Sequence, residues 1–186
     1  MNEQVQTELK KILNGRFSTS ESTRANYARG EDTYDPVLSK AVVFPETNEE
    51  VSKILSICND HKVPVVPFGT GTSLEGNVVG NENGITISLE KMNKVLSVNV
   101  EDFDCRVQAC VTREQLNDYL REDGVFFPID PGANAAIGGM ASTSASGTMA
   151  VKYGTMKTVI SGLTVVLPNG DIINTGSRTK KNFSWL

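Results

Sequence analysis

Cysteine and histidine, the residues that most often build metal sites and disulfide frameworks, are scarce in this 186-residue sequence. The three cysteines, Cys58, Cys105 and Cys110, are odd in number and lack the short paired spacing of zinc ligands. This pattern argues against a disulfide-stapled domain and predicts no metal site. Unpaired thiols are typical of a reducing compartment, so we expect the protein in the cytoplasm.

Basic residues are too few to form a broad positive surface. The 18 lysines and arginines are outnumbered by 22 acidic residues, and the net charge is −4. Binding to nucleic acid depends on neutralising backbone phosphates, so this balance argues against nucleic acid as the main partner.

Long apolar segments are also missing. No run approaches the roughly 20 residues that a membrane-spanning helix needs, so we expect no transmembrane segment. Residues 1–17 contain acidic residues and no apolar stretch, which is not typical of a signal or transit peptide. We expect a cytoplasmic protein, with peripheral attachment to a membrane left open.

Periodicity and capping signals predict a mixed series of helices and strands. Helices are expected at residues 3–13 and after Thr47 and Thr112, since each threonine precedes Glu or Gln at capping-box spacing. Their apolar faces are expected to include Val51, Ile54, Leu55 and Cys58 in one helix and Leu116, Tyr119 and Leu120 in another. Strands are expected at residues 41–44, 63–67, 84–89, 94–100, 105–111, 163–167 and 171–175.

The order of these elements indicates the fold class. A short polar turn separates strands 84–89 and 94–100, and Asn169-Gly170 between the last two strands is a strong hairpin signal. The chain runs β-α-β, then a strand series, a helix and a hairpin. This order predicts an α+β fold rather than a doubly wound parallel sheet.

The first of two glycine-rich loops, residues 67–77, directly follows an expected strand. Its glycines allow sharp turns, and successive backbone N–H groups in such a turn form a nest that binds anions. The loop lacks the Gly-Lys-Ser/Thr of a Walker A motif and the spacing of the G-x-G-x-x-G dinucleotide fingerprint. Taken alone, it is also compatible with an ordinary turn.

The second glycine-rich loop, residues 131–147, consists almost wholly of small, uncharged residues. Such a stretch suits a surface against which a flat, bulky ligand packs, and it is also compatible with a close helix–helix contact. The presence of both loops in one modest chain predicts a phosphate-bearing ligand.

Several motifs in combination resemble the FAD-linked oxidases related to vanillyl-alcohol oxidase and p-cresol methylhydroxylase. Within that family the sequence is most similar to the branch of D-lactate dehydrogenase (cytochrome) and the glycolate oxidase D subunit. The resemblance runs from about Arg24 to Asn182. The segments that carry it are Pro64–Gly76, Phe127–Gly132, Ile137–Ala141, Ala145–Gly147, Lys152–Met156 and Leu163–Gly170.

The resemblance implies a FAD-binding domain of p-cresol methylhydroxylase type, in which FAD lies between two α+β subdomains. The domain is expected at residues 36–182, divided at about 36–100 and 101–182, after an N-terminal helix and polar segment at 1–35. Residues 183–186 are an atypical tail, and the C-terminal substrate (cap) domain of the family is expected to be absent.

The resemblance also implies which residues contact the cofactor. Backbone N–H groups of the first loop would wrap the pyrophosphate, and small residues of the second loop would line the flavin and its ribityl chain. The implied set is Phe68, Gly69, Thr70, Gly71, Thr72, Ser73, Leu74, Gly76, Pro131, Gly132, Ala136, Gly138, Gly139, Ser142, Ser144, Ser146, Gly147, Tyr153 and Gly154.

Some positions depart from the family pattern. Cys110 stands where members usually have glycine, and Thr158 and Val159 stand where an acidic residue and asparagine are common. Some relatives attach flavin covalently through histidine or cysteine. The only histidine, His61, is expected to be a solvent-facing residue at a helix end, so non-covalent FAD is expected.

The activity implied by the resemblance is oxidation of a small 2-hydroxy acid of the D-lactate or glycolate type. A hydride would pass from the α-carbon to FAD, with a quinone or a cytochrome among the candidate electron acceptors. Arg106, Arg113 and Arg178 are interpreted as solvated charges, so no catalytic residue is assigned. The chain is expected to be inactive alone; the alternatives are a flavin-binding module that needs a partner chain and a non-functional fragment.

Overall fold

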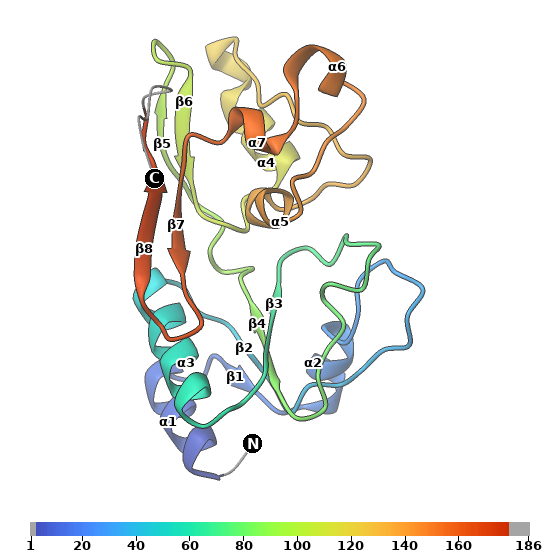
Figure 1. The fold of residues 1–186 in the computed structure, drawn as a ribbon, viewed down its shortest axis with the longest axis vertical. Helices are drawn as coiled ribbons and strands as arrows, with labels where there is room; N and C mark the ends of the chain where they lie inside the picture. The colour runs from blue at the N-terminus through green and yellow to red at the C-terminus, as the bar shows by residue number, and fades with distance from the viewer. Residues whose placement is uncertain (1–2, 179–186) are drawn as a thin grey trace, which may run out of the picture.

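The computed structural model describes residues 3–178, which form two lobes, one above the other (Figure 1). The helices are α1 Glu3–Leu13, α2 Glu21–Asn26, α3 Asn48–Asp60, α4 Arg113–Leu120, α5 Ile137–Ser142, α6 Ala150–Tyr153 and α7 Met156–Val159, with a 3₁₀ turn at Arg121–Asp123. The strands are β1 Phe17–Ser18, β2 Ala41–Val43, β3 Val65–Phe68, β4 Ile85–Ser88, β5 Val95–Asn99, β6 Asp104–Val107, β7 Gly162–Val166 and β8 Ile172–Gly176.

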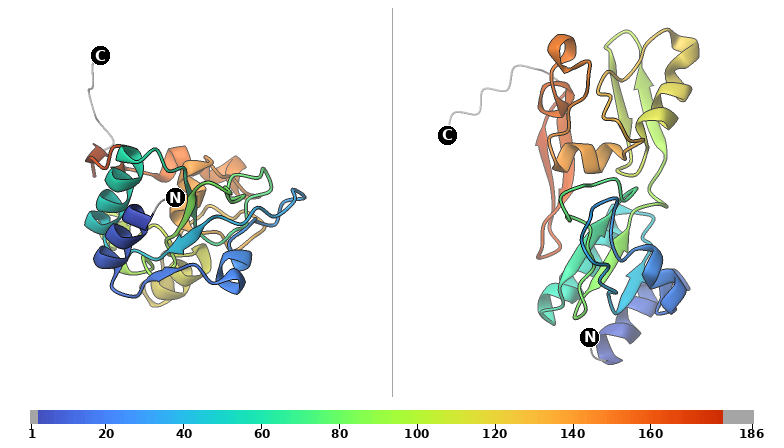
Figure 2. Two further views of the ribbon diagram at one scale, coloured as in Figure 1. Left: turned by 90° about the horizontal axis from the view of Figure 1, so that it is seen from below. Right: turned by 90° about the vertical axis from the view of Figure 1, so that its right-hand side faces the viewer.

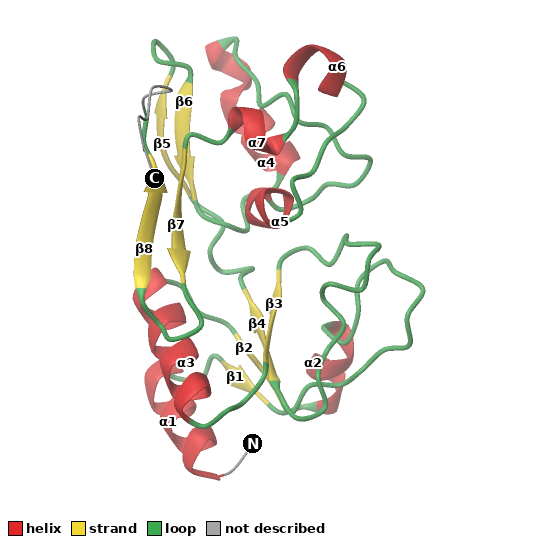
Figure 3. Ribbon diagram, viewed as in Figure 1, coloured by secondary structure: helices red, strands yellow, loops and turns green. Residues whose placement is uncertain are grey.

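The lower lobe contains a four-stranded sheet in the order β1-β2-β4-β3 (Figure 3). Strands β2, β4 and β3 are parallel, with Ile85 opposite both Ala41 and Val65, and β1 pairs antiparallel with β2. Helix α3 is the crossover that connects β2 to β3. All four residues of the central strand β4 are buried, as expected for a strand with neighbours on both edges.

The core of this lobe lies between the sheet and helices α1 and α3. Helix α1 buries Val5, Leu9 and Leu13 at a spacing of four residues, which places them on one face. Helix α3 buries Ile54 and Cys58 against the same cluster. The Thr47 hydroxyl accepts the N–H of Glu50 at 3.2 Å, which confirms the expected start of α3.

The upper lobe contains two antiparallel hairpins, β5–β6 and β7–β8. Strands 84–89 and 94–100 were expected to be joined by a short polar turn, and β4 and β5 are joined in this way, but the two strands do not pair with each other. Strand β4 has β2 on one side and β3 on the other, so neither edge is free for β5. Residues 89–94 instead lead the chain from the lower lobe into the upper one.

Helices α4, α5 and α7 contribute the buried residues of the core of the upper lobe (Figure 2). Leu116 and Leu120 of α4 are buried beside Val111, and Met140 and Met156 pack around Ile129. Tyr119 was expected on the apolar face of α4 but is 59% exposed. The 3.6-residue repeat places Leu116 and Leu120 on one stripe, and Tyr119 points to the side of it.

The strand pairing bears on the division of the chain. Helix α1 packs into the core of the lower lobe, and β5 pairs with β6 in the upper lobe. We therefore propose that the two subdomains meet between Ser88 and Val95, with residues 3–35 part of the first. Residues 179–182 of the expected domain and the tail at 183–186 lie outside the described residues.

The Asn169-Gly170 hairpin was correctly predicted, and its turn has a structural role. The turn reaches down to the lower lobe, where the Ser52 hydroxyl of α3 donates to the carbonyl of Gly170 at 2.5 Å. The β7–β8 hairpin thus connects the two lobes along one side of the molecule (Figures 1 and 2). No helix among residues 3–178 has the length and apolar character required to cross a membrane.

Candidate functional site

The first glycine-rich loop begins at the carboxyl end of β3, where the lower lobe faces the upper lobe (Figure 1). In sheets with parallel strands, ligands bind in the crevice outside the carboxyl ends of those strands. The order of elements therefore brings this loop to the usual position for a ligand.

The loop presents a row of unused hydrogen-bond donors. Within the described residues, none of the six backbone N–H groups from Gly69 to Leu74 donates a hydrogen bond to another protein group. Gly69, Gly71, Thr72 and Ser73 are buried or half-buried, where N–H groups are normally paired, so their unpaired amides indicate a binding surface. Gly71 has a φ of +74°, which produces the turn that such an anion-binding nest needs.

Aromatic rings support the loop from below. Phe68 is buried, and a Cβ on Gly71 would lie 2.8 Å from its Cζ, so the turn rests directly on this ring. Tyr27 packs edge-on against Phe68 with ring centroids 5.0 Å apart, and against Phe44 at 5.6 Å. The side chain of Phe68 is therefore a support for the loop.

Tyr27 also connects this support to the start of the inter-lobe segment. Its hydroxyl donates to the carboxylate of Glu90. Burial, and then this hydrogen bond, raise the pKa of Tyr27 to about 12. Tyr27 is consequently a neutral phenol at physiological pH.

The second loop is held against the start of α4. Ala136 forms an antiparallel bridge with Thr112, and the Ile137 N–H donates to the carbonyl of Val111 at 2.8 Å. Helix α5 then begins at Ile137 and buries Met140. The short small-residue helix is thereby fixed at the face of the upper lobe toward the lower one (Figure 1).

The two loops meet at Ala136. Its N–H donates to the Thr70 hydroxyl at 3.3 Å, and a Cβ on Gly69 would lie 3.3 Å from the Cβ of Ala136. The structure therefore brings together two loops that the sequence analysis identified separately.

The glycines of the second loop fall into two groups. A Cβ on Gly132 or Gly139 would meet nothing within 4 Å, so open space adjoins both. A Cβ on Gly138 would lie 2.8 Å from the Cβ of Ala109, and one on Gly147 would lie 2.1 Å from the carbonyl oxygen of Asp130. Gly138 and Gly147 are thus required by packing within the protein, whereas Gly132 and Gly139 leave room for a ligand.

An open pocket of about 660 Å³ lies beside this loop. Asp130 lines it, and hydrogen bonds from the Thr148 hydroxyl and then the Met149 N–H hold the pKa of this carboxyl below its usual range. The residues that line the pocket are Arg113, Asp130, Pro131, Gly132, Ser146, Gly147 and Thr148. Four of them belong to the cofactor set that the resemblance implied.

Arg113 differs from its interpretation as a solvated charge. Its Nη2 lies 3.3 Å from the carboxylate of Glu114, but its Nε is buried and has no hydrogen-bond partner among the described residues. The sequence gave no sign that this atom is buried, because burial depends on contacts made only in the folded chain. Arg178 does lie on the surface, where it pairs with Asp102 and Asp104.

The remaining residues of the implied set lie farther along the upper lobe. Ser142, Ser144 and Ser146 are exposed, and the Ser142 hydroxyl donates back to the carbonyl of Gly138. Tyr153 packs edge-on against Phe126 at 5.7 Å, on α6 at the far end of the lobe from β3 (Figure 1). The structure therefore groups Gly69–Leu74 with Ala136, and it does not bring Tyr153 or Gly154 to that junction.

The departures from the family pattern are accommodated locally. Cys110 is buried, which raises the pKa of its thiol, and its N–H donates to the carbonyl of Met92 at 2.9 Å. Thr158 accepts the N–H of Thr155 at the start of α7. His61 is the C-cap residue of α3 and is half-buried.

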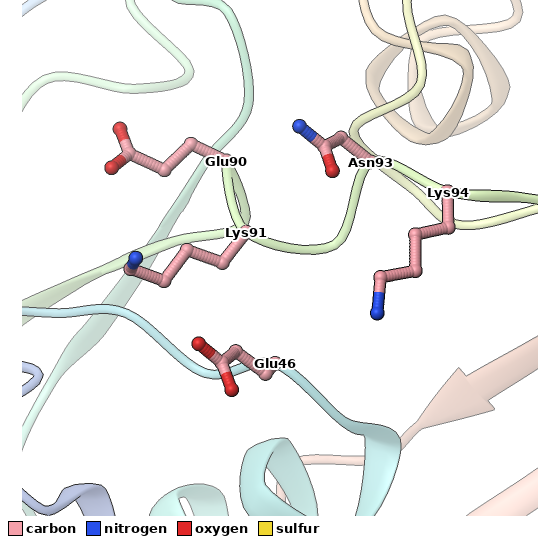
Figure 4. A pocket seen from close by; sticks show the side chains of 5 residues that line it. All are labelled: Glu46, Glu90, Lys91, Asn93 and Lys94. Carbon is pink, nitrogen blue, oxygen red and sulfur yellow. The ribbon is translucent and has the colours of Figure 1, made fainter.

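A second depression, of about 510 Å³, lies among residues of the segments that follow β2 and β4. Its lining residues are Glu46, Glu90, Lys91, Asn93 and Lys94, and their charged ends point in different directions (Figure 4). The two carboxylates offset the charge of the two lysines, and the depression lacks the free glycine-loop amides. It is therefore a poorer candidate than the junction of the two loops.

Sequence reasoning missed Gly30, Glu31 and Tyr34, which lie against the first loop from behind, and Asp32, whose carboxylate accepts the N–H groups of Gly30 and Tyr34. They lie in a polar segment with no hydrophobic repeat, which the sequence analysis set apart from the domain. A usable signal was present, because an aspartate side chain in a polar segment often accepts the N–H two residues further on, as Asp32 does from Tyr34.

The family model described as "FAD binding domain" matches residues 39–176. The chain is 43% identical over 178 residues to the mitochondrial D-lactate dehydrogenase (cytochrome) of Arabidopsis thaliana. The aligned region covers 95% of this chain and 31% of that protein. It is 34% identical over 168 residues to glycolate oxidase subunit GlcD of Bacillus subtilis, covering 89% of this chain and 36% of that one.

Solved structures show the same arrangement of elements. Alkyldihydroxyacetonephosphate synthase matches 96% of this chain and 36% of its own, with a TM-score of 0.85 and 24% identity. p-Cresol methylhydroxylase matches 93% of this chain and 35% of its own, with a TM-score of 0.79 and 24% identity. The chain spans about a third of the length of the curated relatives it matches.

Proposed function

Because the chain belongs to the FAD binding domain family and has the FAD-binding fold of p-cresol methylhydroxylase type, we propose that it is the FAD-binding portion of a flavin-dependent 2-hydroxy-acid dehydrogenase. The observation that carries the proposal is the row of free N–H groups from Gly69 to Leu74, which meets the small-residue loop at Ala136. The substrate class rests on the names of the relatives, D-lactate dehydrogenases and a glycolate oxidase subunit.

The residues present fit this cofactor. A diphosphate is stabilised by several backbone N–H donors without a lysine clamp, and the first loop carries no charge from Gly69 to Leu74. The open space beside Gly132 and Gly139 allows a flat ring to approach the backbone closely. The chemistry that bound FAD supplies is acceptance of a hydride from a substrate C–H bond.

The roles proposed for individual residues follow from their positions. The amides of Gly69–Leu74 bind the diphosphate, and Gly132, Ala136 and Gly139 form the surface beside the ring system. The hydroxyl of Thr70 holds the two loops together. Cofactor attachment is proposed to be non-covalent, with no substrate-binding residue assigned within this chain.

Titration of the flavin-free chain with FAD tests the proposal. We expect quenching of flavin fluorescence and, at FAD concentrations 100-fold above Kd, stabilisation by about 2.7 kcal/mol. For a chain of this size that corresponds to a rise in Tm of roughly 5–10 °C. No quenching and no change in Tm would overturn the proposal, and flavin that remains attached after acid precipitation would overturn non-covalent binding.

The substrate proposal has its own test. Addition of D-lactate or glycolate to the FAD-loaded chain under anaerobic conditions is expected to leave the flavin absorption bands unchanged, since the chain alone is proposed to be inactive. Bleaching of the bands by either acid would contradict inactivity and would identify the substrate directly.

A second candidate is a flavin-binding module that works together with another chain. The apolar residues Leu163, Ile172 and Ile173 of the β7–β8 hairpin favour it, because each is between 38% and 41% exposed. Elution of the chain as a monomer in gel filtration, both without FAD and with FAD bound, would argue against this candidate. The cytoplasmic location stays a prediction, since the Arabidopsis and zebrafish relatives are named as mitochondrial.

A further inference from the structure

A segment before β2, residues 28–34, lies against the back of the first glycine-rich loop, and we refer to it as the strap. In Figures 1 and 2 the strap and the loop after β3 run side by side at the edge of the lower lobe. The Glu31 N–H donates to the carbonyl of Gly71 at 2.9 Å. The strap is thus in direct backbone contact with the centre of the loop.

The contact is too close for any side chain at its middle. A Cβ on Gly30 would lie 2.5 Å from the carbonyl oxygen of Gly71 and 2.9 Å from that of Ser73. At the far end of the loop, a Cβ on Gly76 would lie 2.8 Å from the ring of Tyr34. Two carbonyl groups of the loop therefore face the strap.

The direction of these carbonyls determines the direction of the amides. No peptide bond in the described residues is cis, and in a trans peptide the C=O and the following N–H point in opposite directions. With the Gly71 carbonyl directed at the strap, the N–H of Thr72 points away from it. The carbonyl of Ser73 faces Gly30 in the same way, so the N–H of Leu74 also points away.

Asp32 holds the strap in this shape. Its side chain is among the few buried polar groups of the chain, with the residue 6% exposed. One carboxylate oxygen accepts the N–H of Gly30 at 3.1 Å, and the other accepts the N–H of Tyr34 at 3.0 Å. The carboxylate thereby closes a tight turn around Glu31, whose N–H is the one that meets Gly71.

The strap is anchored at its start as well. Ala28 is buried, and its carbonyl accepts the N–H groups of Val37 and Gly80 at 3.2 and 2.9 Å. The strap is therefore held at Ala28 and, through Tyr34, at Gly76. A change at Asp32 alters the backbone between these two points, and the Glu31 N–H transmits that change to the loop.

We propose that Asp32 is a positioning residue for the cofactor: by closing the strap on Glu31 it directs the amides of Thr72 and Leu74 toward the diphosphate. This inference rests on the proposed function, since it concerns the same diphosphate. Asp32 itself donates and accepts nothing at the cofactor side. Its effect reaches the ligand only through the orientation of the loop peptides.

Asp32→Asn is the direct test, and Asp35→Asn is the matched control. Asp35 is exposed, and its replacement by asparagine removes the same charge three residues away. The asparagine side chain has only one acceptor oxygen, so it can accept from Gly30 or from Tyr34 but not from both. Its NH₂ group would face the N–H of the other residue. We expect FAD affinity, measured by fluorescence quenching, to fall roughly tenfold or more in Asp32→Asn and less than twofold in Asp35→Asn. The Tm of the flavin-free chain is measured for each variant.

Binding of ADP to a folded variant tests the orientation of the loop amides separately from the stability of the chain. It contains the diphosphate without the flavin ring, and its binding is followed by the amide signals of residues 69–74 in ¹H–¹⁵N NMR spectra. We expect these signals to respond to ADP in the original chain and to respond much less in a folded Asp32→Asn variant. Gly30→Ala, which adds a methyl group against the Gly71 carbonyl, is expected to have the same effect without altering a charge.

The outcomes separate the two proposals. If the original chain binds neither FAD nor ADP, the proposed function fails. If the original chain binds FAD, and both Asp32→Asn and Gly30→Ala bind it equally well, the function stands and the role of Asp32 is overturned. Should Asp32→Asn fail to fold, the Gly30→Ala variant decides the question by the same titrations.

Discussion

The Thr70 hydroxyl and the Ala136 N–H, 66 residues apart in the sequence, lie 3.3 Å apart and join the two glycine-rich loops. One loop belongs to the lower lobe and the other to the upper lobe, so this hydrogen bond connects the two lobes at the proposed cofactor site. It also uses a side chain rather than one of the loop amides, which leaves the amides of Gly69–Leu74 available for a ligand.

Replacement of Thr70 by valine is expected to weaken FAD binding by roughly fivefold, the effect of one lost neutral hydrogen bond of about 1 kcal/mol. Valine has the same shape without the acceptor oxygen, so the Ala136 N–H loses its partner. Thr70→Ser retains the oxygen and is expected to bind nearly as well as the original chain. Equal Kd values for all three proteins in fluorescence titrations would show that the contact between the loops does not matter for binding.

Gly138 and Gly139, adjacent in α5, are expected to respond oppositely to alanine. A Cβ at Gly138 meets Ala109, so Gly138→Ala should destabilise the flavin-free chain by about 1–3 kcal/mol. A Cβ at Gly139 meets nothing, and alanine is favoured over glycine in a helix, so Gly139→Ala should leave Tm unchanged or raise it.

The same pair distinguishes packing from ligand contact. Gly139→Ala is expected to reduce FAD affinity although it leaves the flavin-free chain stable, because its methyl group occupies the space proposed for the ring system. Chemical denaturation and FAD titration of both variants measure the two effects. Undiminished FAD binding by Gly139→Ala would place the ring system elsewhere.

The Arg16–Glu50 pair is expected to contribute stability that disappears in acid. The two side chains form a bidentate pair at 2.5 and 2.6 Å, and each is about 20% exposed. The hydrogen bond from Arg16 is the main cause that lowers the pKa of Glu50 below its ordinary value of 4.5. A lowered folded-state pKa means that the contribution is complete above about pH 4.5 and is lost as the pH falls further.

Glu50→Gln is therefore expected to be less stable than the original chain by about 1–2 kcal/mol at pH 7. The difference should shrink as denaturation is repeated at decreasing pH below 4.5. A difference that stays constant down to pH 3 would mean that the ion pair is not its cause.

Tyr27 is expected to limit stability in alkali. Its pKa is raised to about 12 from an ordinary value of 10, mainly by burial. A raised folded-state pKa means that its contribution is complete below about pH 10 and is lost as the pH rises toward 12. Thermal denaturation between pH 8 and 11.5 should show a steeper loss of Tm in the original chain than in Tyr27→Phe, and parallel curves would exclude this cause.

Local signals in the sequence were sufficient for individual elements. Residues 3–13 were expected to be helical and form α1, Thr47 and Thr112 marked the starts of α3 and α4, and Asn169-Gly170 marked the last hairpin. Each of these signals acts over a few residues, where backbone geometry and capping outweigh distant contacts. The short turn between β4 and β5 did not by itself reveal which strands pair, because it carries no information on β2 and β3, which occupy both edges of β4.

For the site, the sequence identified both glycine-rich loops and the class of ligand they suit, and the matched family confirms FAD. It did not distinguish Gly138, which packs on Ala109, from Gly139, which faces open space. It also gave no sign that Arg113 is covered or that the strap supports the first loop. These properties depend on atoms from segments far apart in the chain.

The sequence by itself determined the positions of the two glycine-rich loops and the expectation that backbone N–H groups of the first bind an anion. Glycine content is a local property of the chain, so it can be read without the fold. Only the tertiary structure decided which of those donors face the proposed cofactor site. The Gly71 carbonyl is directed by Glu31, 40 residues earlier, and Thr70 is joined to Ala136, 66 residues later. Peptide orientation at the site is set by such long-range hydrogen bonds, the first within the lower lobe and the second between the two lobes.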